Sequence, residues 1–289
     1  MTKAALFLNF EQMETQINDL KLNPQLVKDL LVRFIRDELD KVGFNKVVVG
    51  LSGGVDSALS ASLAAEAIGP ENVLCVVLPY KTSSKDSVED AELLATAFNL
   101  KTEIVDISKS ADAIIDREPS TGNVRKGNIL SRTRMIILYD ISARDRSLVL
   151  GTSNKTELLL GYGTLFGDMA HAINPIGDLY KTQVWQLAGF VGVPEKIVKK
   201  KPSADLWAGQ TDEAELGYSY EEIDKVLYLL VDQKMKTGEV VALGFPEKMV
   251  DDLYRMMVRS QFKRRPPIIA KVGHRTINVD FRYLRDWGA

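Results

Sequence analysis

Apolar residues follow two alternating patterns along this chain. Short β-branched or leucine-rich runs, typical of buried strands, occur at residues 47–51, 73–78, 102–105 and 147–151. Between them, apolar positions three and four residues apart predict helices at residues 24–42, 56–68, 87–98 and 129–143. Because strands and helices alternate, we expect a doubly wound α/β fold with a mainly parallel sheet and helices on both faces.

The C-terminal part of the chain follows the helical pattern alone. Helical spacing predicts helices at residues 180–191, 220–234 and 246–262. Residues 116–127 and 199–217 are polar and lack apolar periodicity, so we expect mobile loops there. We interpret residues 1–289 as a single domain, with a strand-and-helix core at about residues 24–200 and a helical part at about residues 201–289.

The composition narrows the class of protein. The 289 residues are 45% hydrophobic, enough for one substantial core, and the formal net charge of −2 argues against general binding of nucleic acid or membrane surfaces. We find no signal peptide or membrane span and expect a cytoplasmic location. Cys75 is the single cysteine, and His171 and His274 are the only histidines. These counts exclude an internal disulfide and a Cys/His metal cluster.

The first strand run leads into a loop suited to binding phosphate, Gly50-Leu51-Ser52-Gly53-Gly54-Val55-Asp56-Ser57. A glycine turn between a strand and a helix presents backbone N–H groups to an anion. The loop lacks the lysine of a G-x-x-x-x-G-K-[ST] motif and does not match G-x-G-x-x-G. A bare Asp56 carboxylate would repel phosphate, which indicates a bridging Mg²⁺ ion. The alternative is a plain turn in which Asp56 only favours the first turn of the helix.

Further polar residues follow the other strands. Because the carboxyl ends of parallel strands share one edge, residues 52–57, 79–84 and 152–157 should lie on one rim. Glu157 is the candidate for a second Mg²⁺ ligand, and the alternative is an acid in the first turn of a surface helix. Lys181 opens a helix, where the dipole disfavours a cation, so it indicates a nearby anion. Arg132 and Arg134 share one helix but not one face, and the residues alone assign neither.

Several strings occur together and in a definite order. They are SGGVDS at residues 52–57, NILSRTRM at 128–135, GTSNKTE at 151–157, GYGT at 161–164, GD at 167–168, NPIGDLYKT at 174–182, PSADL at 202–206 and DEAELG at 212–217. The first string is similar to the loop of the N-type ATP pyrophosphatases, which cleave ATP between the α and β phosphates. The whole set resembles the NAD synthetase family and covers most of the chain.

The resemblance implies that ATP adenylylates the carboxylate of deamido-NAD and that ammonia then displaces AMP to give NAD. It implies that residues 50–57 hold the ATP phosphates, that Asp56 and Glu157 bind Mg²⁺, and that Thr152, Lys181 and Ser203 are the other ATP contacts. Asp56, Glu157 and Lys181 are the expected catalytic residues. The resemblance also implies a homodimer, for which apolar faces of the helix at residues 129–143 are a candidate buried surface.

The same resemblance bears on the deamido-NAD end of the site. Arg132 matches a deamido-NAD contact of the family. Phe262 and Lys263 stand where better-known bacterial members carry His-Lys, and Lys263 can still meet a phosphate or carboxylate. Leu165 and Ala172 stand where those members place a Lys and an Asp that hold deamido-NAD. Other polar groups, with Asp168 and His171 as candidates, must then bind that end.

Alternative functions remain open from the sequence. One is another N-type ATP pyrophosphatase, such as a GMP synthetase core or a tRNA-thiolating enzyme, although the latter predicts a basic face and sulfur-carrying cysteines. A non-catalytic nucleotide-binding module is a second alternative, which two acids positioned for Mg²⁺ argue against. Cys75 lies in an apolar run where desolvation suppresses its thiolate, so we expect free ammonia rather than glutamine to be the direct nitrogen donor.

Overall fold

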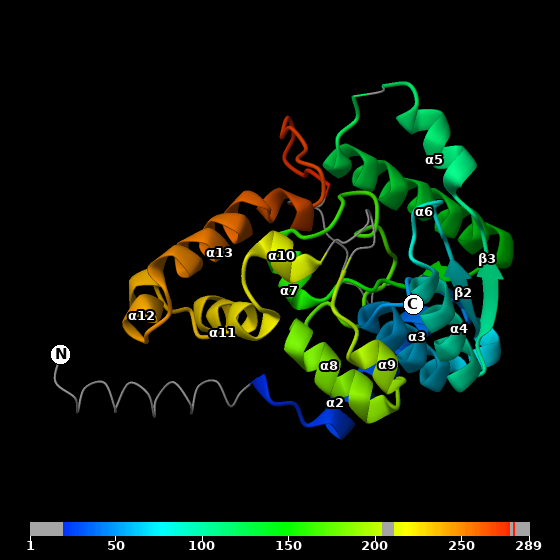
Figure 1. Ribbon diagram of the computed structural model, residues 1–289, viewed down its shortest axis with the longest axis horizontal. Helices are drawn as coiled ribbons and strands as arrows, with labels where there is room; N and C mark the ends of the chain where they lie inside the picture. The colour runs from blue at the N-terminus through cyan, green and yellow to red at the C-terminus, as the bar shows by residue number, and fades with distance from the viewer. Residues whose placement is uncertain (1–19, 119, 204–210, 278–279, 281–289) are drawn as a thin grey trace.

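A parallel sheet lies on one side of the computed structural model, at the right in Figure 1, and the structure describes residues 20–118, 120–203, 211–277 and 280. Its strands are β1 Val47–Gly50, β2 Val73–Val77, β3 Lys101–Ile104 and β4 Leu148–Val149. They lie in the order β3-β2-β1-β4, and each neighbouring pair is parallel. The predicted doubly wound α/β fold is therefore confirmed.

Side chains of β1 alternate between two apolar cores on opposite faces of the sheet. Val47 and Val49 belong to one core together with Cys75, whereas Val48 belongs to the other together with Val76. Each of these five side chains is at most 1% exposed. Because both faces are covered, β1 needs a continuous valine run rather than an alternation of apolar and polar residues.

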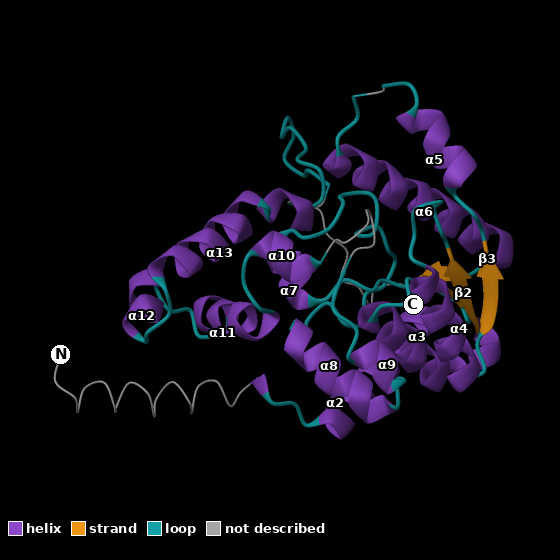
Figure 2. Ribbon diagram, viewed as in Figure 1, coloured by secondary structure: helices purple, strands orange, loops and turns teal. Residues whose placement is uncertain are grey.

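Helices cover the two faces of the sheet (Figure 2). The core that contains Val47 and Val49 is built with α2 Pro24–Lys41, α3 Val55–Ile68, α4 Lys85–Ala97, α8 Lys181–Val191 and α9 Glu195–Val198. The core that contains Val48 is built with α5 Ser108–Ile115 and α6 Asn123–Asp145. The short helix η2 Pro70–Asn72 leads from α3 into β2.

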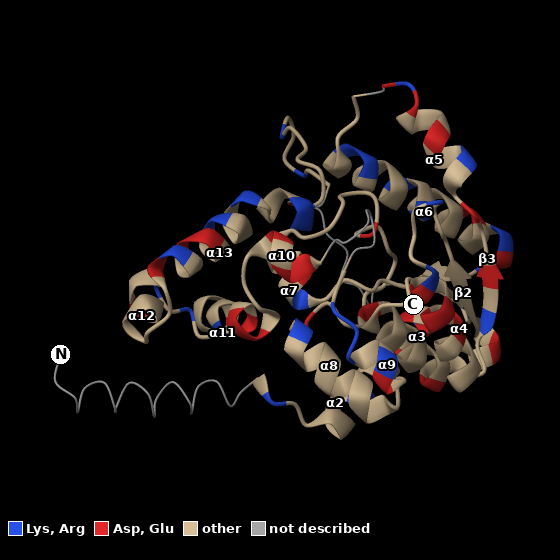
Figure 3. Ribbon diagram, viewed as in Figure 1, with Lys and Arg blue, Asp and Glu red and all other residues tan. Residues whose placement is uncertain are grey.

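The C-terminal part adds a third core beside the sheet. It is formed by α7 Lys155–Leu160, α10 Asp212–Leu216, α11 Tyr220–Val231, α12 Thr237–Ala242 and α13 Glu247–Arg259, after which comes η3 Gln261–Arg264. Trp185 of α8 packs against both this core and the core of α2 and α3. None of the helices in the described part of the chain is long and apolar enough to cross a membrane. Acidic and basic residues are interspersed over the helices, as the nearly balanced charge suggests (Figure 3).

The structure differs from the sequence-based expectation at two polar segments. The prediction of a loop at residues 116–127 is wrong from Asn123 onward, because α6 begins there. The first turn of α6 is exposed and polar, so no apolar periodicity marks it. Within residues 199–217, α10 is a helix that was not predicted, and residues 204–210 lie outside the described residues. The short helices α5, α9 and α12 were also missed, because four to eight residues give too little periodicity.

A buried hydrogen-bond network joins helix α11 of the C-terminal part to the first turns of α7 and α8. Asp224 of α11 is fully buried, and its carboxylate accepts hydrogen bonds from Thr156 Oγ1 at 2.6 Å and Thr182 N at 2.8 Å. Thr156 Oγ1 in turn accepts from Lys181 N at 3.0 Å. Burial raises the pKa of Asp224 to about 6, against the lowering effect of these hydrogen bonds. The network therefore fixes the first turns of α7 and α8 relative to α11.

Asp224→Ala should lower the free energy of unfolding by about 3 kcal/mol, because two buried donors lose a charged acceptor. Glu221→Ala, on the exposed side of the same helix, is the control and should change it by less than about 0.5 kcal/mol. Urea unfolding followed by circular dichroism measures both. Equal midpoints for the two variants would show that the network contributes nothing.

Candidate active site

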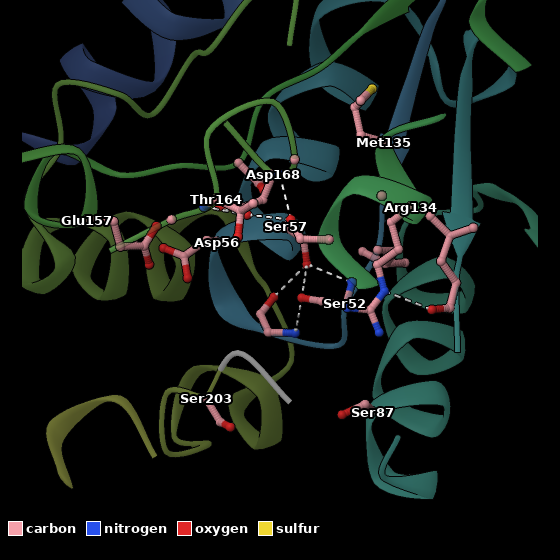
Figure 4. Close-up of a pocket in the computed structure, with 18 of the residues that line it drawn as sticks. Ser52, Asp56, Ser57, Ser87, Arg134, Met135, Glu157, Thr164, Asp168 and Ser203 are labelled. Carbon is pink, nitrogen blue, oxygen red and sulfur yellow. Dashed lines mark hydrogen bonds between the residues drawn. The ribbon is translucent and has the colours of Figure 1, made fainter. Parts of the chain in front are cut away.

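A cavity of about 740 Å³ opens at the carboxyl ends of the strands. Its lining comes from the segments that follow β1, β2 and β4, together with residues of α6, α8 and the C-terminal part (Figure 4). This is the edge at which parallel α/β sheets bind ligands. The rim expected from the sequence is therefore present.

The loop after β1 forms one wall of this cavity and is held by its own serines. Ser57 Oγ accepts from Ser52 N at 3.2 Å and donates to Gly54 O at 3.0 Å, and Gly54 N donates to Ser52 Oγ at 3.3 Å. Gly53 has φ +74°, and a Cβ at this position would lie 2.2 Å from the Ser87 carbonyl oxygen. Only glycine fits that backbone. The helix α3 then begins at Val55 without a side-chain cap, and its first turn lines the cavity, which leaves its first N–H groups available for an anion.

Three charged side chains from three helices meet at one end of the cavity. Lys181 Nζ lies 2.5 Å from Asp56 Oδ2 and 3.5 Å from Glu157 Oε1. The carboxyl groups of Asp56 and Glu157 lie side by side in Figure 4. Asn154 Nδ2 donates to Asp56 Oδ1 at 2.9 Å and fixes that carboxylate from the other side. The structure thus brings the three expected catalytic residues together from α3, α7 and α8.

Burial and charge shift the pKa values of this group. Burial alone would lower the pKa of Lys181, but the charges of Asp56 and Glu157 and the hydrogen bond to Asp56 raise it above its ordinary value. The pKa of Glu157 is raised to about 8, first by burial and then by the nearby charge of Asp56, against the opposing effect of Lys181. Two carboxylates in one buried site are therefore only partly compensated by one lysine.

The residues present fit a Mg²⁺ ion that is carried by a nucleotide. Over the described ranges, no three His, Cys, Asp or Glu side chains converge as they would in a metal site built from protein alone. Mg²⁺ in nucleotide sites takes one or two carboxylates and completes its shell with phosphates and waters. Asp56 and Glu157 are such a pair, and a divalent cation would relieve the repulsion that raises the pKa of Glu157.

Glu157 also has the structural role that was its alternative interpretation. It closes a capping box at the start of α7, in which Asn154 Oδ1 accepts from Glu157 N at 2.9 Å and Glu157 Oε2 accepts from Asn154 N at 3.3 Å. Its other oxygen, Oε1, faces Lys181. The cap therefore orients Glu157 and leaves one oxygen toward the cavity.

Of the four residues expected to bind deamido-NAD, two line the cavity and two do not. Asp168 lines the cavity and accepts from Ser131 Oγ at 2.7 Å and Thr164 N at 2.9 Å. Lys263 also lines it and donates to the carbonyl oxygens of Gly161 and Gly163 at 2.8 and 2.7 Å. Arg132 and Phe262, by contrast, are absent from the lining found among the described residues.

Arg134 is the arginine of α6 that lines the cavity, and sequence reasoning left it unassigned. Its Nε donates to the Leu78 carbonyl oxygen at 3.0 Å, which places it beside the strand ends and near Ser52 (Figure 4). Arg132 instead donates through Nε and Nη2 to the Leu165 carbonyl oxygen, both at 3.2 Å. The two arginines are two residues apart on one helix and therefore diverge, as expected.

The remaining expected contacts, Thr152 and Ser203, line the cavity, as do residues 50–52 and 54–57 of the loop. His171, the second candidate for the deamido-NAD end, also lines it. Asp212 was missed as an individual residue. It lines the cavity and accepts from the hydroxyl groups of Tyr162 and Tyr220, each at 3.1 Å. The string at residues 212–217 contained this signal, but the segment around it lacks apolar periodicity and was expected to be a mobile loop.

Comparison with known proteins agrees with this geometry. The model of the NAD synthase family matches residues 27–267. An NH(3)-dependent NAD(+) synthetase of Trichlorobacter lovleyi is 57% identical over 93% of this chain and 98% of its own length. The structure is similar to an NMN synthetase from Francisella tularensis, with TM-score 0.77, 33% identity and coverage of 86% and 99% of the two chains. It is also similar to an NH3-dependent NAD synthetase from Campylobacter jejuni, with TM-score 0.75, 37% identity and coverage of 86% and 100%. This chain, with its glycine loop and its paired acids around a buried lysine, belongs to the NAD synthase family.

Proposed function

We propose that this protein is an ammonia-dependent NAD synthetase, which converts deamido-NAD, ATP and ammonia into NAD, AMP and pyrophosphate. The observation that carries the proposal is the cluster of Asp56, Glu157 and Lys181 at the mouth of the glycine loop. Family membership favours this function over a GMP synthetase core, a tRNA-thiolating enzyme or a non-catalytic nucleotide-binding module.

ATP fits the wall of the cavity formed by residues 50–57. The free N–H groups at the start of α3 and the turn at Gly53 suit the phosphates. Thr152, Ser203 and Arg134 line the same cavity and are the proposed further contacts. Asp56 and Glu157 would hold Mg²⁺, which when bound neutralises phosphate charge and favours departure of pyrophosphate.

The first chemical step activates the carboxylate of the substrate. A carboxylate oxygen of deamido-NAD attacks the α-phosphorus of ATP, the bond to the α,β-bridging oxygen breaks, and pyrophosphate leaves with the electron pair. Lys181 lies where it can stabilise the charge that develops on the phosphates, and it costs no reorganisation because its neighbours already orient it. The product is a mixed anhydride with AMP, a good leaving group.

The second step forms the amide. The lone pair of ammonia attacks the carbonyl carbon, AMP departs with the electron pair of the bond between that carbon and the phosphate oxygen, and the nitrogen loses a proton to water. Asp168 and Lys263 line the cavity beside residues 161–164 and are proposed to hold deamido-NAD there. Arg132 is proposed to reach the same substrate from the edge of the cavity, where it now contacts Leu165. Phe262 is 61% exposed, so its proposed contact would need the substrate to extend over η3.

The nitrogen donor is proposed to be free ammonia. Cys75 is fully buried in β2, and burial raises the pKa of its thiol to about 12. A thiol of that kind is not ionised near neutral pH and cannot act as the nucleophile that releases ammonia from glutamine.

The proposal extends to organisation and location. We propose a single domain, because Trp185 links the core of the sheet to that of the C-terminal helices. We propose a homodimer, since Ile136 and Tyr139 on α6 are 61% and 40% exposed and offer an apolar surface to a second copy. A cytoplasmic location is proposed from the substrates, and neither nucleic acid nor a membrane is a proposed partner.

The purified protein with deamido-NAD, ATP, Mg²⁺ and ammonium should form NAD, AMP and pyrophosphate in equal amounts, whereas glutamine should give no NAD. At subsaturating ammonium the rate should rise with mildly alkaline pH, because only unprotonated ammonia has a free lone pair. Cys75→Ala should keep the ammonium-dependent rate. Chromatographic product analysis checks these points. Glutamine-dependent NAD formation that Cys75→Ala abolishes, or a clear preference for nicotinate mononucleotide over deamido-NAD, would contradict the proposal.

Asp56→Asn and Glu157→Gln should each reduce pyrophosphate release by about a hundredfold or more, because each removes a proposed ligand of the Mg²⁺ ion that would neutralise phosphate charge. Both variants should stay folded by circular dichroism, since Lys181 keeps one carboxylate partner in each. Glu66→Gln is the control, as this acid of α3 pairs with Lys28 on the surface. Near wild-type turnover of either variant at saturating Mg²⁺ would show that its carboxylate is not a metal ligand.

Substitution of the two arginines of α6 should affect KM for different substrates. Arg132→Ala should raise KM for deamido-NAD about tenfold and leave KM for ATP nearly unchanged, because a lost charged hydrogen bond has roughly that effect. Arg134→Ala should do the reverse, and each variant is the control for the other. Steady-state kinetics with one substrate varied at a time provides the test. An unchanged KM for deamido-NAD in Arg132→Ala would remove this residue from the substrate site.

A further inference from the structure

Lys200 stands beside the glycine loop and has no role in the function described so far. It follows α9 by two residues and lines the cavity. Its Nζ lies 3.5 Å from the Gly53 carbonyl oxygen and 3.4 Å from Ser87 Oγ, and it donates to Asp90 Oδ2 at 2.7 Å. The ammonium group is therefore held at the turn of the loop that is proposed to carry the phosphates.

Asp90 of α4 holds two lysines at once. It is 1% exposed, and its second oxygen Oδ1 forms an ion pair with Lys196 Nζ at 2.7 Å. Burial would raise the pKa of Asp90, but the hydrogen bonds from Lys196 and Lys200 outweigh it and keep the pKa below its ordinary value. One carboxylate thus pairs with two ammonium groups, of which Lys196 also feels the charges of Glu89 and Asp86, whereas Lys200 lies toward the loop.

Of the other lysines that line the cavity, Lys181 and Lys263 have competing partners, and Lys201 is exposed. Lys181 is shared between Asp56 and Glu157, and Lys263 is bound to two backbone carbonyl groups. The two contacts of Lys200 other than Asp90 are long and weak by comparison, and an ammonium group has three donors. Lys200 can therefore turn donors toward an anion in the loop while it stays paired with Asp90.

We propose that Lys200 binds the terminal phosphates of ATP, and the pyrophosphate formed from them, as a further catalytic residue that Asp90 holds in place. This inference rests on the proposed function. When the bond between the α-phosphorus and the bridging oxygen breaks, the negative charge moves onto pyrophosphate, and Lys200 stabilises it by hydrogen bonds without transferring a proton. Lys196 shares the same carboxylate, but it is mostly exposed and lies outside the described cavity lining.

Lys200→Met and Lys196→Met form a matched pair, because each removes one of the two lysines from Asp90 and leaves the other. Lys200→Met should raise the inhibition constant for pyrophosphate against ATP about tenfold or more, and KM for ATP in the same direction. Lys196→Met should change both by less than about twofold, because Lys196 is exposed and lies outside the cavity lining. Lys200→Arg should lie between Lys200→Met and wild type, since it keeps the charge but changes the geometry.

Thermal unfolding of both methionine variants shows whether loss of the ion pair destabilises them alike. Titration calorimetry with Mg²⁺ and pyrophosphate measures the binding step without turnover. Equal inhibition constants for wild type and Lys200→Met, or equal weakening by the two methionine variants, would overturn the inference and leave a structural ion pair. A wild-type protein that binds pyrophosphate but forms no NAD would refute the proposed function, and the calorimetric comparison would still decide the role of Lys200.

Discussion

The structure depends on a buried lysine that two carboxylates hold between them. Taking the ammonium group of Lys181 out of water is costly unless a well-placed acid compensates for that cost. Asp56 lies 2.5 Å from its Nζ and Glu157 3.5 Å, and these distances require the first turns of α3, α7 and α8 to converge. The Asp224 network and the Asn154 cap act on these same turns, so much of the polar interior beside the sheet serves to position one cation.

Much of this could be predicted from the sequence because the causes are local. The valine run at residues 47–49 requires a strand covered on both faces, and the glycines that follow require a tight turn before a helix. Lys181 was a candidate because a cation at the start of a helix is electrostatically unfavourable unless an anion lies nearby. The acids that pair with it, Asp56 and Glu157, are 125 and 24 residues away along the chain. They were candidates because the carboxyl ends of parallel strands share one edge of the sheet.

The features that could not be predicted depend on how distant segments pack together, which the sequence of one segment does not determine. Which of Arg132 and Arg134 faces the cavity follows from the rotation of α6 on the sheet, and its exposed polar first turn hid where the helix starts. Lys200 lies in a stretch without periodicity, and its partner Asp90 is 110 residues earlier. Family resemblance indicated Arg132 and Phe262 by position, whereas the structure shows Arg132 against Leu165 and Phe262 exposed.

Leu165 and Ala172, the positions at which the family resemblance implied a Lys and an Asp, bear on how the second substrate would be held. Ala172 offers no functional group, and at residue 165 the group used is the backbone carbonyl, which accepts from Arg132. A backbone acceptor is present whatever the side chain, so the guanidinium can be oriented there without an acidic residue. Asp168 sits three residues further on, anchored by Ser131 Oγ and Thr164 N, and keeps a carboxylate at the cavity wall. In the proposed reaction, the charges facing deamido-NAD are thus supplied by Arg132, Asp168 and Lys263, each of which is oriented by hydrogen bonds to residues 131 or 161–165 that involve no second charged side chain.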